Sequence, residues 1–272
     1  MRAALAEDVG SGDVTSIATI PADHESRAAM VARQDLVLAG AAVAELAFRE
    51  VDAELRVERK MADGDRAPAG ATIMTVGGRT RSILTGERVA LNFLQRLCGV
   101  ATLTARYVAA VGHTKAKILD TRKTTPGWRH LEKYAVACGG GQNHRIGLYD
   151  LVLIKDNHLA ALSGEKPDAV GAAVARARKH FPELRVEVEA DRLDQVRQAV
   201  AAGADIILLD NMSNDELREA VAIVAGRAQT EASGGVNLDT VAGIAETGVD
   251  LISVGAITHS ATAVDIGLDY LA

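Results

Sequence analysis

A repeated strand–loop–helix pattern in the second half of the chain constrains the fold most strongly. From Ile118 onward, short runs rich in β-forming residues alternate with Ala-rich amphipathic segments, several of which end at glycine. The expected strands are 118–121, 151–155, 185–189, 206–210, 229–233 and 251–255, and the expected helices are 169–180, 192–203, 214–226 and 238–248. Strands that alternate with helices form parallel sheets. The pattern predicts an incomplete, about six-stranded α/β barrel, with an open doubly wound sheet as the structural alternative.

The first part of the chain follows a different pattern. Strand candidates at 27–40, 53–61 and 71–84 surround a helical segment at 41–51, and turn signals occur at Asp63-Gly64 and Pro68-Ala69-Gly70. A long helical pattern at 82–111 joins the two parts. We therefore expect an N-terminal mixed α+β domain over 1–102 and a C-terminal α/β barrel catalytic domain over 103–272.

Composition excludes several classes of protein. The formal net charge of −6 argues against nucleic-acid binding, which normally requires a basic face. No apolar run approaches the ~20 residues that cross a bilayer, and Glu7 and Asp8 interrupt the start where a signal peptide would stay apolar. Cys98 and Cys138 are too few for a disulfide framework. We expect a cytoplasmic protein that binds neither membranes nor nucleic acids.

Polar residues or glycines follow all of the expected barrel strands. In chain order these are Thr121-Arg122-Lys123, Lys155-Asp156-Asn157, Glu189, Asp210-Asn211, Ser233-Gly234-Gly235 and Gly255-Ala256. Any one of them is explained by the solvent exposure of a strand end. The ordered series of cations, anions and glycines is not, because catalytic groups of α/β barrels lie at the carboxyl ends of the strands. The series predicts an active site there.

The cations of this series indicate a strongly anionic substrate. Arg122, Lys123, His144, Arg145 and Lys155 lie beside strand-like segments rather than along a helix face. Arginine pairs bidentately with carboxylates, whereas lysine acts as a point charge on phosphate. A pocket with both predicts one substrate with carboxylates and a second with phosphates. A lone histidine is more often structural, but His144 precedes Arg145 and follows a glycine run.

The acidic and glycine-bearing positions complete the predicted site. Glu189 and Asp210 suit Mg²⁺, held directly or through water, or the hydroxyls of a sugar; alternatively, Glu189 balances a nearby cation. The loops at Ser233–Gly235 and Val254–Ala256 lie between a strand and a helix, where backbone N–H groups attract phosphate.

Eight motifs together resemble those of the quinolinate phosphoribosyltransferase family, the carboxylating nicotinate-nucleotide pyrophosphorylases. They are ALAEDVGSGDVTS, ERVALNFLQRLCGVAT, TRKTTPGWR, GGGQNHRIGLYDLVLIKDNH, VEVEADRLDQV, IILLDNMS, EASGGVNLDTV and ISVGAITHS, in this order from residue 4 to residue 260. The resemblance implies a pentosyltransferase that converts quinolinate and phosphoribosyl pyrophosphate, with Mg²⁺, into nicotinate mononucleotide, pyrophosphate and CO₂ in de novo NAD biosynthesis.

The resemblance also implies roles for individual residues. It assigns Thr121, Arg122, Lys123, His144, Arg145 and Lys155 to the quinolinate and pyrophosphate region, Glu189 and Asp210 to the ribose and metal, and Ser233, Gly234, Gly235, Val254, Gly255 and Ala256 to the substrate phosphate. Of these, Lys123, Lys155, Glu189 and Asp210 are the expected catalytic residues. Arg88 corresponds to an arginine that enters the site of a neighbouring subunit. A homodimer with shared sites follows, and assembly into a hexamer stays open.

Two other functions remain open at this point. One is a related phosphoribosyltransferase with another acceptor such as nicotinate. The other is a non-catalytic protein that binds a phosphate ligand, which would need neither the acidic pair nor the lysines.

Overall fold

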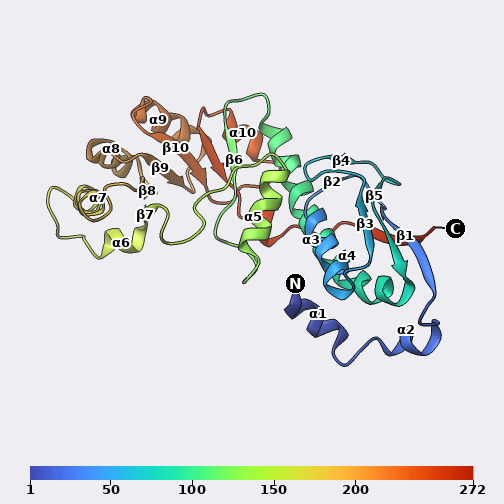
Figure 1. Ribbon diagram of the computed structural model, residues 1–272. Coiled ribbons are helices and arrows are strands. Elements are labelled where there is room, and N and C mark those ends of the chain that lie inside the picture. The colour runs from blue at the N-terminus through green and yellow to red at the C-terminus, as the bar shows by residue number, and fades with distance from the viewer. Residues whose placement is uncertain (272) are drawn as a thin grey trace. The chain divides into compact units, whose positions relative to one another are not determined.

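The computed structural model describes residues 1–271, and the chain divides into two compact units (Figure 1). The first unit contains residues 1–105, 131–140 and 261 to the end of the described chain. The second contains residues 106–130 and 141–260. The units thus interleave along the sequence, and the domain boundary at residues 102 and 103 stays a prediction. No helix within residues 1–271 is long and apolar enough to cross a membrane.

A parallel six-stranded sheet forms the centre of the second unit. Its strands are β6 (Lys117–Leu119), β7 (Val152–Ile154), β8 (Val186–Ala190), β9 (Ile206–Asp210), β10 (Gln229–Ser233) and β11 (Leu251–Ser253). Their order in the sheet is β6-β11-β10-β9-β8-β7. Strand β6, the first of the six along the chain, thus pairs with β11, the last. Among the described residues, the ring of strands is open only between β6 and β7. This arrangement confirms the predicted incomplete α/β barrel.

Helices follow strands β7 to β11 of this sheet along the chain. They are α6 (Asp156–Ala160), α7 (Ala169–His180), α8 (Leu193–Ala202), α9 (Asn214–Val224), α10 (Val241–Ala245) and α11 (Ala256–His259). Helices α7, α8 and α9 pack against their neighbours in sequence, as Figure 1 shows. Local signals set their ends: Ser213 and Glu216 form a capping box at the start of α9, and α8 stops at Gly203 in the left-handed conformation.

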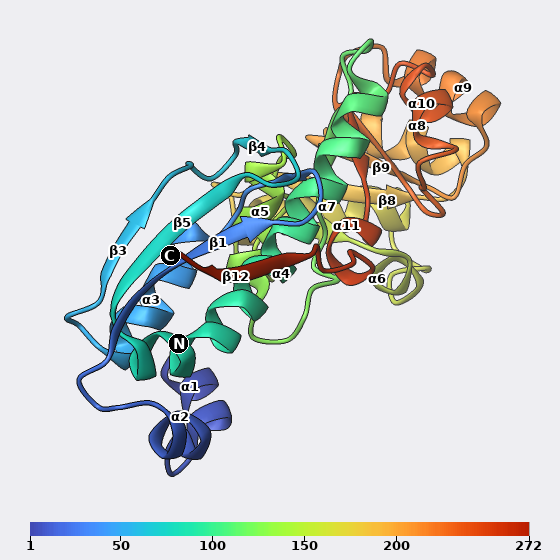
Figure 2. The same cartoon turned by 90° about the vertical axis from the view of Figure 1, so that its right-hand side faces the viewer.

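The first unit is built on an antiparallel sheet of order β12-β1-β5-β3 (Figure 2). These strands are β1 (Glu25–Ala32), β3 (Arg56–Arg59), β5 (Thr72–Arg79) and β12 (Ile266–Tyr270), and β2 (Leu36–Val37) pairs separately with β4 (Arg66–Ala67). The helices are α1 (Arg2–Val9), α2 (Val14–Thr19), α3 (Ala41–Val51), α4 (Thr80–Val111) and α5 (Arg129–Cys138), of which α4 and α5 each have an end in the second unit.

Steric contacts fix the packing of α4 in the first unit. A Cβ added at Gly99 would collide with the carbonyl oxygen of Thr262. The helix backbone and the segment before β12 therefore approach more closely than any side chain at this position allows. Strand β12 follows this segment and pairs with β1, from Ala28 opposite Tyr270 to Ala32 opposite Ile266.

Candidate active site

The carboxyl ends of the parallel strands bring the predicted acidic residues and lysines together. Lys155 follows β7, and its Nζ lies 2.8 Å from Oε2 of Glu189 at the end of β8. Asp210 ends β9, the next strand of the sheet. Burial, followed by the charge of Glu189, raises the pKa of Asp210, whereas Lys155 and Lys123 lower it. These four residues therefore form one electrostatic group.

The two glycine-bearing loops are held close to this group. Gly234 has a φ of 94°, and a Cβ there would collide with the side chain of Asn211, whose backbone N–H donates to the carbonyl of Ser233 over 2.9 Å. Beyond the end of β11, a Cβ at Gly255 would lie 3.1 Å from Cδ of Lys123. The loops after β9 and β10, and those after β6 and β11, thus approach one another at the positions where glycine occurs.

Arg122 and Arg145 form a cationic group in the same unit. Burial, followed by the like charge of Arg122, lowers the pKa of Arg145, and Nε of Arg122 is buried without a hydrogen-bond partner among the described residues. Arg129, another cation of this segment, has a structural role. Its guanidinium donates to Oγ1 of Thr124 over 3.1 Å and to the carbonyl of Ile146 over 3.1 Å, which ties the loop after β6 to the segment before β7.

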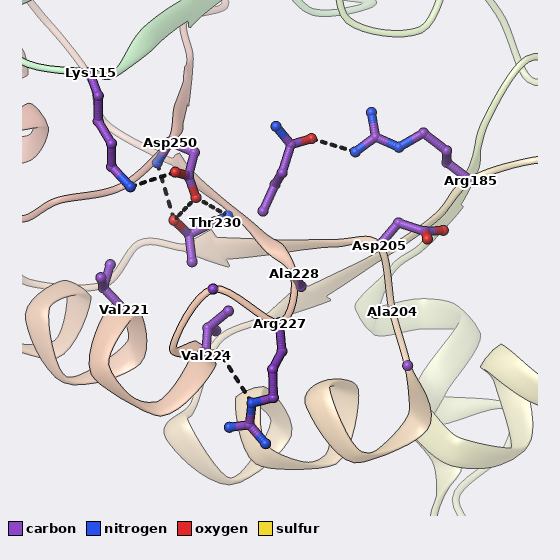
Figure 3. Close-up of a pocket in the computed structure, with 13 residues that line it drawn as sticks. Lys115, Arg185, Ala204, Asp205, Val221, Val224, Arg227, Ala228, Thr230 and Asp250 are labelled. Carbon is purple, nitrogen blue, oxygen red and sulfur yellow. Dashed lines mark hydrogen bonds and ion pairs between the residues drawn. The ribbon is translucent and has the colours of Figure 1, made fainter.

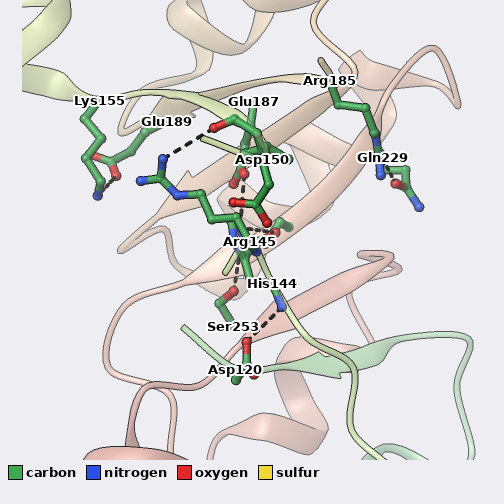
Figure 4. A network of polar contacts seen from close by, with 12 residues as sticks. Asp120, His144, Arg145, Asp150, Lys155, Arg185, Glu187, Glu189, Gln229 and Ser253 are labelled. Carbon is green, nitrogen blue, oxygen red and sulfur yellow. Dashed lines mark hydrogen bonds and ion pairs between the residues drawn. The ribbon is translucent and has the colours of Figure 1, made fainter. Parts of the chain in front are cut away.

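A buried polar network beneath these groups was not predicted from the sequence. His144, Glu187, Glu231 and Ser253 form this interior network (Figure 4). Nε2 of His144 lies 3.0 Å from Oε2 of Glu187 and 3.6 Å from Oε2 of Glu231, and Ser253 Oγ donates to Glu231. Both glutamates are fully buried. No local sequence signal marks them, because β10 also carries Gln229, Thr230 and Ser233, and Glu187 is only two residues from the strand-end Glu189.

A larger cavity of about 560 Å³ lies at the amino ends of the strands, away from the predicted residues (Figure 3). Lys115 and Asp250 on its wall pair with each other over 2.6 Å, and Asp205 pairs with Arg178 over 2.7 Å. Both carboxylates of this wall are therefore paired within the protein, and catalytic groups of such barrels lie at the opposite, carboxyl ends. We therefore place the candidate site at the carboxyl edge.

Arg88 differs from the other predicted residues in its position. It is exposed on α4 in the first unit, whereas the other predicted residues belong to the second. Thr121 and the segment Val254–Ala256 lie directly beyond β6 and β11, respectively.

Two family models cover nearly the whole chain. The model of the quinolinate phosphoribosyl transferase C-terminal domain matches residues 100–269, and that of the N-terminal domain matches residues 13–98. The chain belongs to the quinolinate phosphoribosyltransferase family. The resemblance found in the sequence motifs is thereby confirmed.

Relatives of this quinolinate phosphoribosyltransferase family member match over nearly its full length. A probable carboxylating nicotinate-nucleotide pyrophosphorylase of Bacillus subtilis is 42% identical, with 97% of this chain and 89% of the relative covered. The chloroplastic enzyme of that name from Arabidopsis thaliana is 44% identical, with 98% and 81% covered. The structure of the nicotinate-nucleotide pyrophosphorylase from Francisella tularensis has a TM-score of 0.93 at 42% identity, with 99% of this chain and 94% of that chain covered.

The buried glutamates should make the stability of this family member depend on pH. Burial, followed by the charge of Glu187, raises the pKa of Glu231 to about 7 from its ordinary value of 4.5. A raised carboxyl pKa contributes stability that is complete below the unfolded-state pKa and is lost as pH rises through the folded-state pKa. Glu231→Gln removes this titration, so the stability of the variant relative to the wild type should rise between about pH 5 and about pH 8.

Urea unfolding of both proteins at the two pH values measures this difference. Glu219→Gln, at an exposed carboxylate that pairs with Arg197, is the control and should show no such trend. A relative stability of Glu231→Gln that does not change with pH would contradict the assignment.

Proposed function

We propose that this chain transfers the phosphoribosyl group of phosphoribosyl pyrophosphate to quinolinate, with loss of CO₂, to give nicotinate mononucleotide and pyrophosphate in de novo NAD biosynthesis. Family membership over both domain models supports this reaction. Within the structure, the observation that carries it is the presence of two arginines, two lysines and two carboxylates near one edge of a parallel sheet. The cations of this edge suit two anionic substrates, and its carboxylates suit the positive charge that develops on the ribose during the reaction.

The arginines are the groups we assign to quinolinate. Arg145 and Arg122 lie close enough for their charges to oppose each other, and Arg145 is also partly desolvated. A dicarboxylate would relieve both penalties through charge-assisted bidentate bonds. Held in this way, the ring nitrogen can be directed at the anomeric carbon, and this orientation supplies a large part of the rate.

The carboxylates are the groups we assign to the ribose and to Mg²⁺. Glu189 raises the pKa of Asp210, so the two negative charges repel each other and favour a cation between or beside them. As pyrophosphate departs, positive charge develops on the ribose, and the carboxylates stabilise it electrostatically. The same residues suit Mg²⁺ directly or through water; when bound, the ion neutralises charge on the pyrophosphate.

The lysines and the glycine-bearing loops are the groups we assign to phosphate. Lys123 and Lys155 are exposed and can reach the leaving pyrophosphate, and Thr121 precedes them at the end of β6. The loops at Ser233–Gly235 and Val254–Ala256 offer backbone N–H groups to the 5′-phosphate. Once the ring nitrogen is ribosylated, the pyridinium accepts the electron pair that CO₂ leaves behind, so decarboxylation demands little from the protein.

Two further parts of this proposal concern assembly and location. We propose a homodimer in which Arg88 completes the site of the neighbouring subunit, and a hexamer built from such dimers stays open. The exposure of Arg88 on α4 supports its availability to a partner. The cytoplasmic location stays a prediction.

The reaction is tested by incubating the protein with quinolinate, phosphoribosyl pyrophosphate and Mg²⁺. We expect equal amounts of nicotinate mononucleotide and CO₂, measured by chromatography and by release of labelled carboxyl carbon, and loss of both on chelation of the metal. Turnover of nicotinate without CO₂ release from quinolinate would favour another acceptor. Tight binding measured by calorimetry without turnover would favour a binding protein.

Arg145→Ala should lower kcat/KM for quinolinate strongly, because a charge-assisted hydrogen bond is worth about 1.5–3 kcal/mol, or roughly 10- to 150-fold. Arg145→Lys keeps the charge but not the bidentate fork and should recover only part of this loss. Steady-state kinetics measure the effect. Arg197→Ala, at an exposed ion pair, is the control. A wild-type rate for Arg145→Ala would remove this residue from the carboxylate site.

Mixing Arg88→Ala and Glu189→Ala subunits tests whether sites are shared. In a heterodimer with shared sites, one site carries both changes and the other carries neither. Random mixing makes half of the dimers heterodimers, so roughly a quarter of the wild-type activity should return. Activity no greater than that of the two homodimeric variants would show that Arg88 acts within its own subunit or not at all.

A further inference from the structure

Both ring nitrogens of His144 are engaged inside the protein. Nδ1 accepts a hydrogen bond of 2.7 Å from the backbone N–H of Arg145. Nε2 lies 3.0 Å from Oε2 of Glu187 and 3.6 Å from Oε2 of Glu231, and only 8% of the side chain is exposed. A nitrogen that accepts a hydrogen bond carries no proton, so the arrangement requires the proton on Nε2.

The partners of the ring are the carboxylates of two inner strands, of which Glu231 is held by a hydrogen bond. Glu187 lies on β8 and Glu231 on β10, on either side of β9, and both are fully buried. Ser253 Oγ on β11 donates to Oε1 of Glu231. The backbone N–H of His144 donates to Oδ1 of Asp120 over 2.8 Å (Figure 4). The ring therefore connects the rigid barrel interior to the backbone of Arg145.

We propose that His144 is a positioning residue, held by Glu187 and Glu231, that orients Arg145 for a carboxylate of quinolinate instead of contacting quinolinate itself. This inference rests on the proposed function in one respect, the assignment of Arg145 to the pyridine dicarboxylate. It departs from the expectation that His144 binds the substrate directly, because the arrangement leaves neither ring nitrogen directed toward a ligand.

A metal ion could occupy this network in place of the proton on Nε2. One ligand atom from each of His144, Glu187 and Glu231 lies within 4.8 Å of the others. A metal at this point would need the lone pair of Nε2, which moves the ring proton to Nδ1. A protonated Nδ1 cannot accept the N–H of Arg145. The contact between His144 and Arg145 therefore favours a proton on Nε2 over a metal.

Nitrogen-15 spectra of the ligand-free wild-type protein test the network without any substrate. The spectrum should show His144 as the neutral tautomer with its proton on Nε2. His144→Asn identifies the signal by its loss, and Glu231→Gln should shift it. A doubly protonated ring, or a proton on Nδ1, would overturn the proposal whatever the substrate is.

A double-mutant cycle tests whether His144 acts through Arg145. We expect His144→Ala to raise KM for quinolinate roughly tenfold, with little change in KM for phosphoribosyl pyrophosphate. In the Arg145→Ala background the same change should have almost no further effect, because the residue it positions is gone. Additive losses would mean that His144 binds quinolinate itself and would overturn the proposal.

His144→Asn provides the conservative control and guards against loss of folding. Its side-chain oxygen can replace Nδ1 as the acceptor for the Arg145 N–H, so it should recover most of the KM that His144→Ala loses. Equal impairment of the two variants, with both shown to be folded by thermal unfolding, would contradict positioning through this bond. Absence of any quinolinate turnover in the wild type would refute the proposed function and leave the spectroscopic test intact.

Discussion

The parallel pairing of the six strands is the constraint on which the candidate site depends. In a parallel sheet all strands end at the same edge, so residues far apart in sequence become neighbours without any direct attraction between them. The register makes this concrete, because Ser233 pairs with Asp210 at the end of β10 and β9, and Glu189 pairs with Leu208 one strand further along. The backbone ladder, and not the charges, brings the charges together, and it holds them against their own repulsion.

That repulsion is informative about function. Arg145 opposes Arg122, and Glu189 opposes Asp210, so each group is destabilised as it stands. The ion pair between Lys155 and Glu189 offsets only part of the cost, since Lys155 is 46% exposed and screened by water. A site that stores like charges in this way gains affinity for ligands of opposite sign, at the expense of stability. In the proposed reaction, the dianionic pyridine has the charge that the two arginines attract, and the ribose cation has the charge that the two carboxylates attract.

Sequence patterns predicted the regular elements well where the signal is local. Strands β9 and β10 and helices α3 and α7 match the expected ranges residue for residue. Strand β12 was not predicted, because its partner β1 lies more than 200 residues away and no local pattern reports that pairing. The interior network was not predicted for a related reason. Glu187 lies two residues before the strand-end Glu189, and no local pattern tells a buried carboxylate from an exposed one there. Only the packing of the whole sheet shows that Glu187 is buried with Glu231.

The glycine-bearing loops show how far a sequence signal can be interpreted. Gly234 was predicted from its position between a strand and a helix as part of a phosphate loop, yet its φ of 94° and the side chain of Asn211 already require glycine there. Gly235, with a φ of 61° and open space around its Cα, has no such steric reason beyond its backbone conformation. Because packing alone accounts for the first glycine, the case for phosphate binding depends on the second and on the neighbouring Lys123 and Gly255. The loop geometry therefore supports an anion at this edge only in combination with Lys123, whose side chain lies against Gly255.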